Sequence, residues 1–244
     1  MQDRIAAVTG AAGGMGRAIV ARLLADGLRV AGLDLDGAKL DAMAKEQGDR
    51  FLPCPVDLTK PDQVTQAFER IDSACGGLDV LVNNAGTCFM SDFPDIPAEE
   101  FDSQMQVNFY SAFHCCQAAV PRMLHREGVK KIVNISSNGA YNFDVFDPPH
   151  YRASKAAMDN LTKDLARRYA RHKIAVNSIA PAMTETPLFG VLTQEVLDRA
   201  IAQMPHGRAM QPEEIAAWVS FLVSPAGDIS SGNVLILNQG RDVR

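Results

Sequence analysis

The stretch Thr9-Gly10-Ala11-Ala12-Gly13-Gly14-Met15-Gly16 decides the fold. It follows a short apolar run, Arg4–Thr9, and opens a segment with helical spacing, Met15–Asp26. Glycines permit a tight turn and a close approach of phosphate to the backbone, and the N-terminus of a helix offers free N–H groups to a diphosphate. The order strand, glycine turn, helix therefore predicts a dinucleotide-binding unit. Its spacing is Thr-Gly-x-x-x-Gly-x-Gly rather than Gly-x-Gly-x-x-Gly.

Apolar strands and helices alternate along the rest of the chain. Strands are expected at 4–9, 29–33, 51–56, 79–82, 131–135, 174–179 and 234–237. Helices are expected at 15–26, 39–47, 62–74, 99–124 (one long or two consecutive), 154–171 and 213–223. This alternation indicates a parallel sheet covered on both faces, and right-handed crossovers favour a doubly wound arrangement. We therefore predict an α/β fold, a Rossmann-type three-layer sandwich with about seven parallel strands. Without repeats or linkers, residues 1–244 are expected to form a single domain.

The composition is that of an ordinary globular protein. Hydrophobic residues make up 47% and charged residues 22% of the 244, with a net charge of −5, which argues against a nucleic-acid binder because such proteins need a basic face. No apolar stretch is long enough to span a bilayer, and the N-terminus lacks the apolar segment of a signal peptide. The five cysteines fit neither a disulfide framework nor a zinc site. We expect a cytoplasmic, metal-free protein.

Asp34 ends the second expected strand. A carboxylate there can accept hydrogen bonds from the ribose hydroxyls of adenosine, and it would repel a 2′-phosphate. Position 13 is glycine rather than a basic residue, and only Arg17, one step into the helix, could offset the repulsion of a 2′-phosphate by Asp34. The sequence favours NAD(H) over NADP(H). The alternative role of Asp34 is that of a cap for the following helix.

Tyr151 and Lys155 lie four residues apart at the start of an expected helix, which places both on one face. A neighbouring ammonium favours the phenolate and lowers a tyrosine pKa, so Tyr151 can be a general base toward an alcohol or a general acid toward a carbonyl. Ser137 ends the fifth expected strand, where its hydroxyl can bond to the reacting oxygen. Ser136 competes for this role.

Ordered motifs along nearly the whole chain resemble those of the short-chain dehydrogenase/reductase family, in its compact form. They are Thr9-Gly10…Gly14-x-Gly16, Asp57-Leu58, Asn83-Asn84-Ala85-Gly86, Asn108, Ile135-Ser136-Ser137, Tyr151-x-x-x-Lys155, Asn177…Pro181…Thr186 and Gly207-Arg208…Pro212-Glu213-Glu214-Ile215. Each motif is weak alone, but their order excludes a chance match. Two departures from the family pattern concern the substrate side. Ala182 follows Pro181 in place of the usual glycine, and the segment from Ser137 to Tyr151 is slightly longer than usual.

The resemblance implies a role for each matching residue. Tyr151 is the expected acid/base, Lys155 lowers its pKa and holds the nicotinamide ribose, and Ser137 orients the substrate. Asn108 is expected to order a water that links Lys155 to solvent, which completes the catalytic set. The predicted cofactor-binding set is Gly10, Gly13, Gly14, Met15, Gly16, Asp34, Leu35, Asp57, Leu58, Asn84, Ala85, Gly86, Tyr151, Lys155, Pro181, Thr184 and Thr186.

The substrate side is less well defined by the sequence. Predicted contacts are Ser137, Asn138, Tyr141, Phe143, Tyr151, Met183 and Phe189, with Cys88, Phe89, His150 and Leu188 as further candidates. The segment at about 184–210 lies where a mobile lid would exclude water. These aromatic and apolar groups suggest a compact, cyclic or apolar alcohol, although half of them can equally pack the lid against the body. His150 is left open between substrate contact and surface exposure.

The sequence thus predicts an NAD(H)-dependent oxidoreductase that interconverts a secondary alcohol and a ketone by hydride transfer. Three alternatives remain: a 3-oxoacyl-thioester reductase of the same family, a noncatalytic NAD-binding regulator, and a cofactor-free scaffold subunit. The complete Ser–Tyr–Lys–Asn set argues against the regulator. The resemblance also implies a homo-oligomer, a tetramer or dimer, with the helices at about 99–124 and 152–171 as dimer faces and the C-terminal strand region as a second contact.

Overall fold

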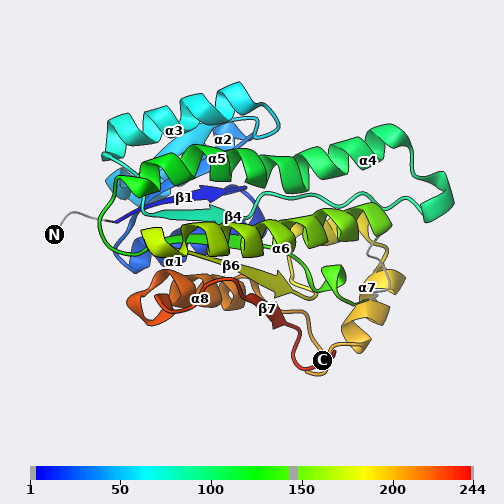
Figure 1. The fold of residues 1–244 in the computed structure, drawn as a ribbon. Coiled ribbons are helices and arrows are strands. Elements are labelled where there is room, and N and C mark those ends of the chain that lie inside the picture. Colours follow the sequence, from blue (N-terminus) through cyan, green and yellow to red (C-terminus); the bar gives the residue numbers. More distant parts are fainter. Residues whose placement is uncertain (1–3, 143–147, 243–244) are drawn as a thin grey trace.

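The computed structural model describes residues 4–142 and 148–242, which form a seven-stranded parallel sheet between two helical layers (Figure 1). The strands are β1 (Ile5–Thr9), β2 (Arg29–Asp34), β3 (Phe51–Pro55), β4 (Val80–Asn83), β5 (Lys130–Ile135), β6 (Ile174–Pro181) and β7 (Val234–Leu237). Their order is β3-β2-β1-β4-β5-β6-β7, and every neighbouring pair is parallel. The predicted α/β Rossmann-type fold is confirmed.

The helices divide between the two faces of the sheet, each over its own apolar core. One face carries α1 (Gly14–Ala25), α2 (Gly37–Gln47) and α8 (Pro212–Val223); the other carries α3 (Pro61–Cys75), α5 (Ser111–Leu124) and α6 (Pro149–Tyr169). Figure 1 shows α1 and α8 on one side of the strands and α3 and α5 on the other. Both faces of the inner strands are covered, which explains why they lack polar alternation.

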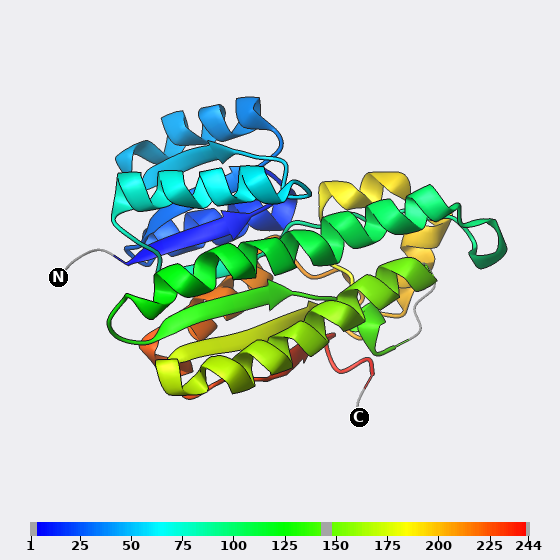
Figure 2. The same cartoon turned by 45° about the horizontal axis from the view of Figure 1, so that its top comes forward.

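The strand order reverses between β1 and β4. From β1 the chain builds outward to β3, returns to place β4 beside β1, and then builds the other way to β7. Figure 2 shows the resulting halves side by side, blue to cyan and green to red. The loops that leave the carboxyl ends of β1 and β4 diverge at this point, and ligands of such sheets bind in the crevice between them.

The expected helix at 99–124 is two α-helices joined by a π-helical segment. α4 (Ala98–Met105) leads into Gln106–Tyr110, which has π geometry, and α5 follows without a loop. A π segment holds one extra residue per turn, so it rotates the side chains on either side relative to each other. The apolar periodicity does not reveal such a segment.

Two other helices differ from the sequence prediction. α6 begins at Pro149, five residues before the expected start, because proline is well accommodated in the first turn of a helix. Tyr151 is therefore inside the helix. α7 (Gln194–Ala202) was not expected at all; Thr193 caps it by accepting a hydrogen bond from the N–H of Val196. Figure 2 shows α7, in gold, beyond the ends of the central strands.

Candidate cofactor and catalytic site

The turn between β1 and α1 requires glycine at two positions. Gly10 has a φ of +62°, and a Cβ there would lie 2.9 Å from the Cα of Ala85. A Cβ at Gly16 would lie 1.9 Å from the carbonyl oxygen of Gly10. The chain therefore folds tightly back on itself, and α1 starts at Gly14 with no side chain capping its N-terminus. Its free N–H groups suit an anionic ligand.

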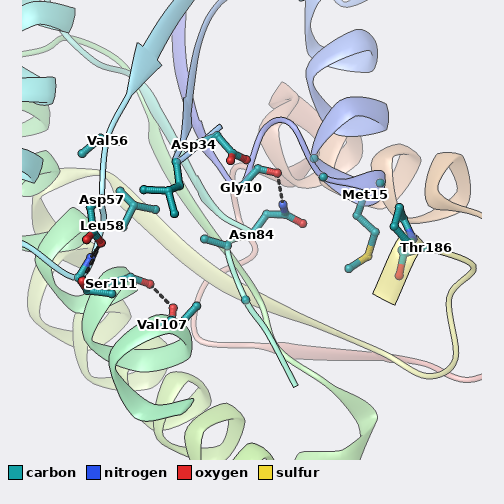
Figure 3. Close-up of a pocket in the computed structure, with 18 residues that line it drawn as sticks. Gly10, Met15, Asp34, Val56, Asp57, Leu58, Asn84, Val107, Ser111 and Thr186 are labelled. Carbon is teal, nitrogen blue, oxygen red and sulfur yellow. Dashed lines mark hydrogen bonds between the residues drawn. The ribbon is translucent and has the colours of Figure 1, made fainter. Parts of the chain in front are cut away.

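A cavity of about 430 Å³ opens in front of this turn (Figure 3). It lies at the strand-order reversal, where the ends of β1, β2 and β4 meet. All the predicted cofactor-binding residues line it except Tyr151, Lys155, Pro181 and Thr184. The structure adds lining residues that no sequence motif marked: Val56, Thr59, Val107, Ser111 and Pro187. Val56, Thr59 and Pro187 come after strands, which was the one available signal. Nothing in the sequence marked Val107 and Ser111, which lie in the π segment and directly after it.

The Asp34 carboxylate is held at the end of β2 by backbone donors. Oδ2 accepts a hydrogen bond from the N–H of Ala12 at 2.9 Å, and Oδ1 accepts one from Asp36 at 3.0 Å. Asp36 itself caps α2, accepting from the N–H of Lys39, so Asp34 is not needed as that cap. Arg17 lies 3.0 Å from Glu46 in an exposed ion pair. Arg17, the basic group that could offset the repulsion of a 2′-phosphate by Asp34, is thus paired with Glu46 instead.

Asn84 ties the loops that follow β1 and β4. Its Nδ2 donates to the carbonyls of Thr9 and Gly10 at 3.0 and 3.1 Å, as Figure 3 shows for Gly10. The Thr9 hydroxyl accepts hydrogen bonds from the N–H groups of Asn84 and Ala85. Asn84 Oδ1 is buried and has no hydrogen-bond partner among the described residues. An unsatisfied acceptor beside a glycine cradle fits a polar ligand in this cavity.

Asp57 supplies a second carboxylate, at the far end of the cavity from Met15 and Thr186 (Figure 3). Its Oδ1 accepts hydrogen bonds from the Thr59 hydroxyl at 2.6 Å and from the Thr59 N–H at 3.0 Å. These bonds, the hydroxyl first, hold the pKa of Asp57 below its ordinary value. The ionised carboxylate is therefore favoured, as an acceptor of hydrogen bonds.

Lys155 lies deep beside the cavity and carries a shifted pKa. Its Nζ donates to the carbonyl of Ile135 at 2.8 Å and lies 5.9 Å from the centre of the Tyr151 ring. Burial lowers the pKa of Lys155 to about 8, and the charge of Asp159 opposes this. A Cβ on Gly86 would lie 3.3 Å from Nζ and 3.4 Å from Oδ1 of Asn108. Tyr151, Lys155, Gly86 and Asn108 are therefore brought together.

Asn108 sits in the π segment with its amide fully engaged. Oδ1 accepts from the N–H of Thr87 at 2.8 Å, while Nδ2 donates to the carbonyl of Thr87 and to the hydroxyl of Ser154. Thr87 follows Gly86, and Ser154 precedes Lys155. The side chain thus anchors the loop after β4 to α6, a role that the sequence did not reveal. The relay role of Asn108 stays a prediction.

The two serines after β5 are in different surroundings. Ser136 Oγ donates to the buried carboxylate of Asp159 at 2.8 Å. Ser137 Oγ accepts from the N–H of Gly139 at 3.1 Å and caps the short turn Asn138–Ala140. Ser136 is committed to a buried contact, which leaves Ser137 as the better candidate for a reacting group.

Most predicted substrate contacts have structural partners. Met183 lies in the apolar core, and Phe189 is partly buried and packs against that core. The Asn138 amide donates to Asp242, accepts from Asn142, and is 1% exposed. The Tyr141 hydroxyl hydrogen-bonds to Asp159. Phe143 lies outside the described residues. The geometry thus gives these predictions little support, and they stay predictions.

The alternative of surface exposure for His150 is wrong. The side chain is completely buried, because α6 starts early and places it against α4. Nε2 lies 3.1 Å from Oε1 of Glu100 without hydrogen-bond geometry, and the ring stacks on Phe101.

The segment after β6 reaches the glycine turn directly. A Cβ on Gly14 would lie 2.8 Å from Cδ of Pro187 and 3.3 Å from Cβ of Thr186. Thr184 forms a bridge to Met210, and its hydroxyl donates to the carbonyl of Ala182. Pro181 is the last residue of β6 and pairs with Leu237. Of these predicted residues only Thr186 lines the cavity.

Across residues 4–142 and 148–242 no helix combines the length and apolarity that a bilayer crossing needs. In the same ranges no cluster of histidine, cysteine, aspartate and glutamate has the arrangement of a metal site.

Comparisons with known proteins agree with this geometry. A family profile described as enoyl-(acyl carrier protein) reductase matches residues 10–242. A 3-oxoacyl-(acyl-carrier-protein) reductase from Thermotoga maritima is 33% identical, with 98% of each chain covered. A short-chain dehydrogenase/reductase from Hericium erinaceus is 36% identical, with 97% of each covered. The crystal structure of a 3-ketoacyl-(acyl-carrier-protein) reductase from Brucella melitensis complexed with NADH superposes with a TM-score of 0.92 at 28% identity, over the full length of both chains. With the fold, the glycine turn and the Tyr151–Lys155 pair in place, the chain belongs to the short-chain dehydrogenase/reductase family and is an oxidoreductase.

Proposed function

We propose that the protein is an NAD(H)-dependent oxidoreductase that interconverts a secondary alcohol and a ketone. The observation that carries this proposal is the placement of buried Lys155 beside the Tyr151 ring, next to a cavity lined by a glycine turn and by Asp34. When bound, the nicotinamide cofactor supplies or accepts the hydride. The chain itself binds the dinucleotide, orients the alcohol and moves the proton.

The proton is handled by Tyr151. A phenolate is favoured by a nearby positive charge, and Lys155, with a pKa of about 8, is largely protonated at neutral pH. In oxidation Tyr151 takes the proton from the alcohol, and in reduction it returns a proton to the ketone oxygen. Ser137 donates a hydrogen bond to the same oxygen and stabilises its developing charge. Lys155 also holds the nicotinamide ribose.

Asp34 supports NAD(H) as the cofactor. Its carboxylate is fixed by two backbone N–H donors at the rim of the cavity, where it accepts ribose hydroxyls and repels a 2′-phosphate. The glycine turn and the start of α1 hold the diphosphate, and Asp57 meets the adenine. The segment at about 184–210 closes the site as a lid. The whole chain, including this lid, forms one domain.

A 3-oxoacyl-thioester reductase is the second candidate. The names of the Thermotoga maritima and Brucella melitensis relatives favour it, and the latter is described in complex with NADH. It uses the same residues in the reductive direction, so only the substrate separates the two. A compact alcohol as substrate and a cytoplasmic location are part of this proposal and are supported by the sequence alone.

The deciding experiment follows absorbance at 340 nm with NAD⁺ and NADP⁺ over cyclic diols, polyols, aromatic alcohols and 3-hydroxyacyl thioesters. We expect NAD⁺-linked turnover of one class. Tyr151→Phe should lower kcat by at least about 100-fold, the usual worth of a general base, and leave the Kd for NADH within twofold. Retained activity in this variant would contradict the mechanism. Turnover of thioesters alone would favour the second candidate, and failure to bind NADH would favour a scaffold.

A further inference from the structure

A buried carboxylate outside the predicted catalytic set lies one helical turn beyond Lys155. Asp159 is on α6 and is 2% exposed. Residues four apart on a helix share a face, so Asp159 and Lys155 point to the same side of α6. The sequence offered no motif for this residue. A buried carboxylate is costly unless its oxygens are hydrogen-bonded and its charge is compensated.

The oxygens of Asp159 are satisfied by hydroxyl groups from three different segments. Ser136, after β5, donates to Oδ2 at 2.8 Å, and Ser178, on β6, donates to Oδ1 at 2.6 Å. The Tyr141 hydroxyl, from beyond the turn Asn138–Ala140, adds a third hydrogen bond. Burial raises the pKa of Asp159 above its ordinary value, and the three hydroxyl bonds oppose that rise by favouring the ionised form.

The same contacts enclose the serine that we assign to the reaction. Ser136 Oγ also lies 3.3 Å from the backbone carbonyl of Lys155. Ser136 and Tyr141 flank Ser137, so Asp159 holds both ends of the segment that presents the Ser137 hydroxyl. It does this from the helix that also carries Tyr151 and Lys155.

Few charged or titratable groups face Lys155 among the described residues. From α6 there are Asp159 and Tyr151; from the loop after β4 there is Cys88. The other polar neighbours, the Ile135 carbonyl and the Asn108 amide, are neutral. Asp159 is the carboxylate among them, and its charge raises the pKa of Lys155 against the effect of burial.

We infer that Asp159 is a positioning residue of this site: it is the internal counter-charge that keeps Lys155 protonated, and it braces the segment that carries Ser137. The inference rests on the proposed function for its catalytic consequence. The part of the inference that concerns the charge of Lys155 can be tested on the protein without cofactor or substrate.

The test begins with a ¹³C NMR titration of the cofactor-free protein labelled at lysine Cε. The Lys155 resonance is assigned by its loss in Lys155→Arg. Asp159→Asn should lower the titration midpoint of Lys155 by about one pH unit, because removing a nearby anion destabilises the ammonium. Asp164→Asn is the matched control: it is the same change on the same helix, at an exposed carboxylate paired with Arg168. Its midpoint should equal that of the wild type.

A second variant guards against misfolding. Asp159→Ser also removes the charge. Its side chain is smaller than that of asparagine and keeps a hydroxyl that can hydrogen-bond to the surrounding hydroxyl groups. A midpoint that falls in both Asp159 variants assigns the effect to the charge. A midpoint that stays at the wild-type value in either folded variant, or falls equally in Asp164→Asn, overturns the inference.

The catalytic consequence is read from the pH profile of kcat/KM for alcohol oxidation. In this direction Lys155 must be protonated, so its deprotonation is an alkaline limb. Asp159→Asn should move that limb to lower pH by the same interval as the NMR midpoint. Loss of the contacts that hold the Ser137 segment should also lower kcat on the plateau below the limb. An unmoved limb overturns the inference. If the wild type oxidises no alcohol, the proposed function fails, while the NMR titration still decides the role of Asp159.

Discussion

Asp34 reaches the cavity from the end of β2 with each carboxylate oxygen already bonded to a backbone N–H. These bonds fix the direction of the carboxylate and its negative charge at the rim. Replacing it by a neutral amide keeps the size of the side chain, removes the charge and leaves one of the two backbone N–H groups without its acceptor. The choice between the two dinucleotides can thus be tested at a single residue.

We expect Asp34→Asn to lower the preference for NADH over NADPH by about tenfold, which corresponds to roughly 1.4 kcal/mol of binding free energy. The loss of repulsion toward the 2′-phosphate and of a ribose acceptor both contribute. The measurement is the ratio of the two dissociation constants by fluorescence titration. Asp36→Asn serves as the control because it makes the same change two residues away, at the cap of α2. Equal effects of the two variants would contradict a specific role for Asp34.

At the scale of elements, the junction of β1 and α1 depends on the absence of one methyl group. A Cβ on Gly16 would lie 1.9 Å from the carbonyl oxygen of Gly10, whereas one on Gly13 would lie 3.4 Å from the same oxygen. The first distance forces the backbone to move, and the second is an ordinary contact.

Gly16→Ala should therefore lower the free energy of unfolding by about 2–3 kcal/mol, the upper part of the usual range for overpacking, and weaken NADH binding. Gly13→Ala should change the free energy of unfolding by less than about 1 kcal/mol, because its backbone angles suit alanine. Urea unfolding measures both. A Gly16→Ala protein as stable as Gly13→Ala would show that the turn has another conformation.

The elements that the sequence predicted well are those whose signal is local. The strands and the glycine turn are marked by apolar runs and by residue types, and the structure matches them within a residue or two. The predictions for α6 and α7 failed differently. α6 begins at Pro149, five residues before the expected start, and α7 is a short amphipathic helix that no sequence motif marked.

Within the site, the sequence identified residues but not their partners. Thr9 and Asp34 end strands and Asn84 follows one, so their meeting at one edge of the sheet follows from parallel topology. The burial of His150 and the hydroxyls around Asp159 depend on how α4, α6 and β6 pack. Contacts between residues distant in sequence leave no periodic trace, and a single sequence could not supply them.

At the scale of the whole molecule, large apolar side chains remain exposed on two helical faces. Trp218 and Phe221 on α8 are 42% and 45% exposed, with their rings edge to face at 6.1 Å. Phe101 on α4 and Tyr110 on the π segment are 44% and 42% exposed. Exposed apolar groups gathered on one element are typical of contacts between subunits.

We expect sedimentation to show species of at least twice the monomer mass of 26.4 kDa. Phe221→Glu should reduce their size, because it buries a charge in the proposed contact. Phe93→Glu is the control, since Phe93 is 76% exposed on the short turn between β4 and α4. A wild-type protein that sediments only as a 26.4 kDa species would contradict the expected homo-oligomer.

The π segment at 106–110 has a consequence for how the gene can change. One codon removed there would let α4 and α5 merge into a regular α-helix, which is the better hydrogen-bonded form. The side chains of α4 would rotate by about 100° around the helix axis relative to those of α5, since each residue of an α-helix advances by that angle. Asn108 would then leave Thr87 and Ser154 while the sheet stayed intact. The shorter chain would gain a regularly hydrogen-bonded helix and lose the contacts of Asn108 that position the catalytic site. Selection for folding stability alone would therefore not preserve the π segment.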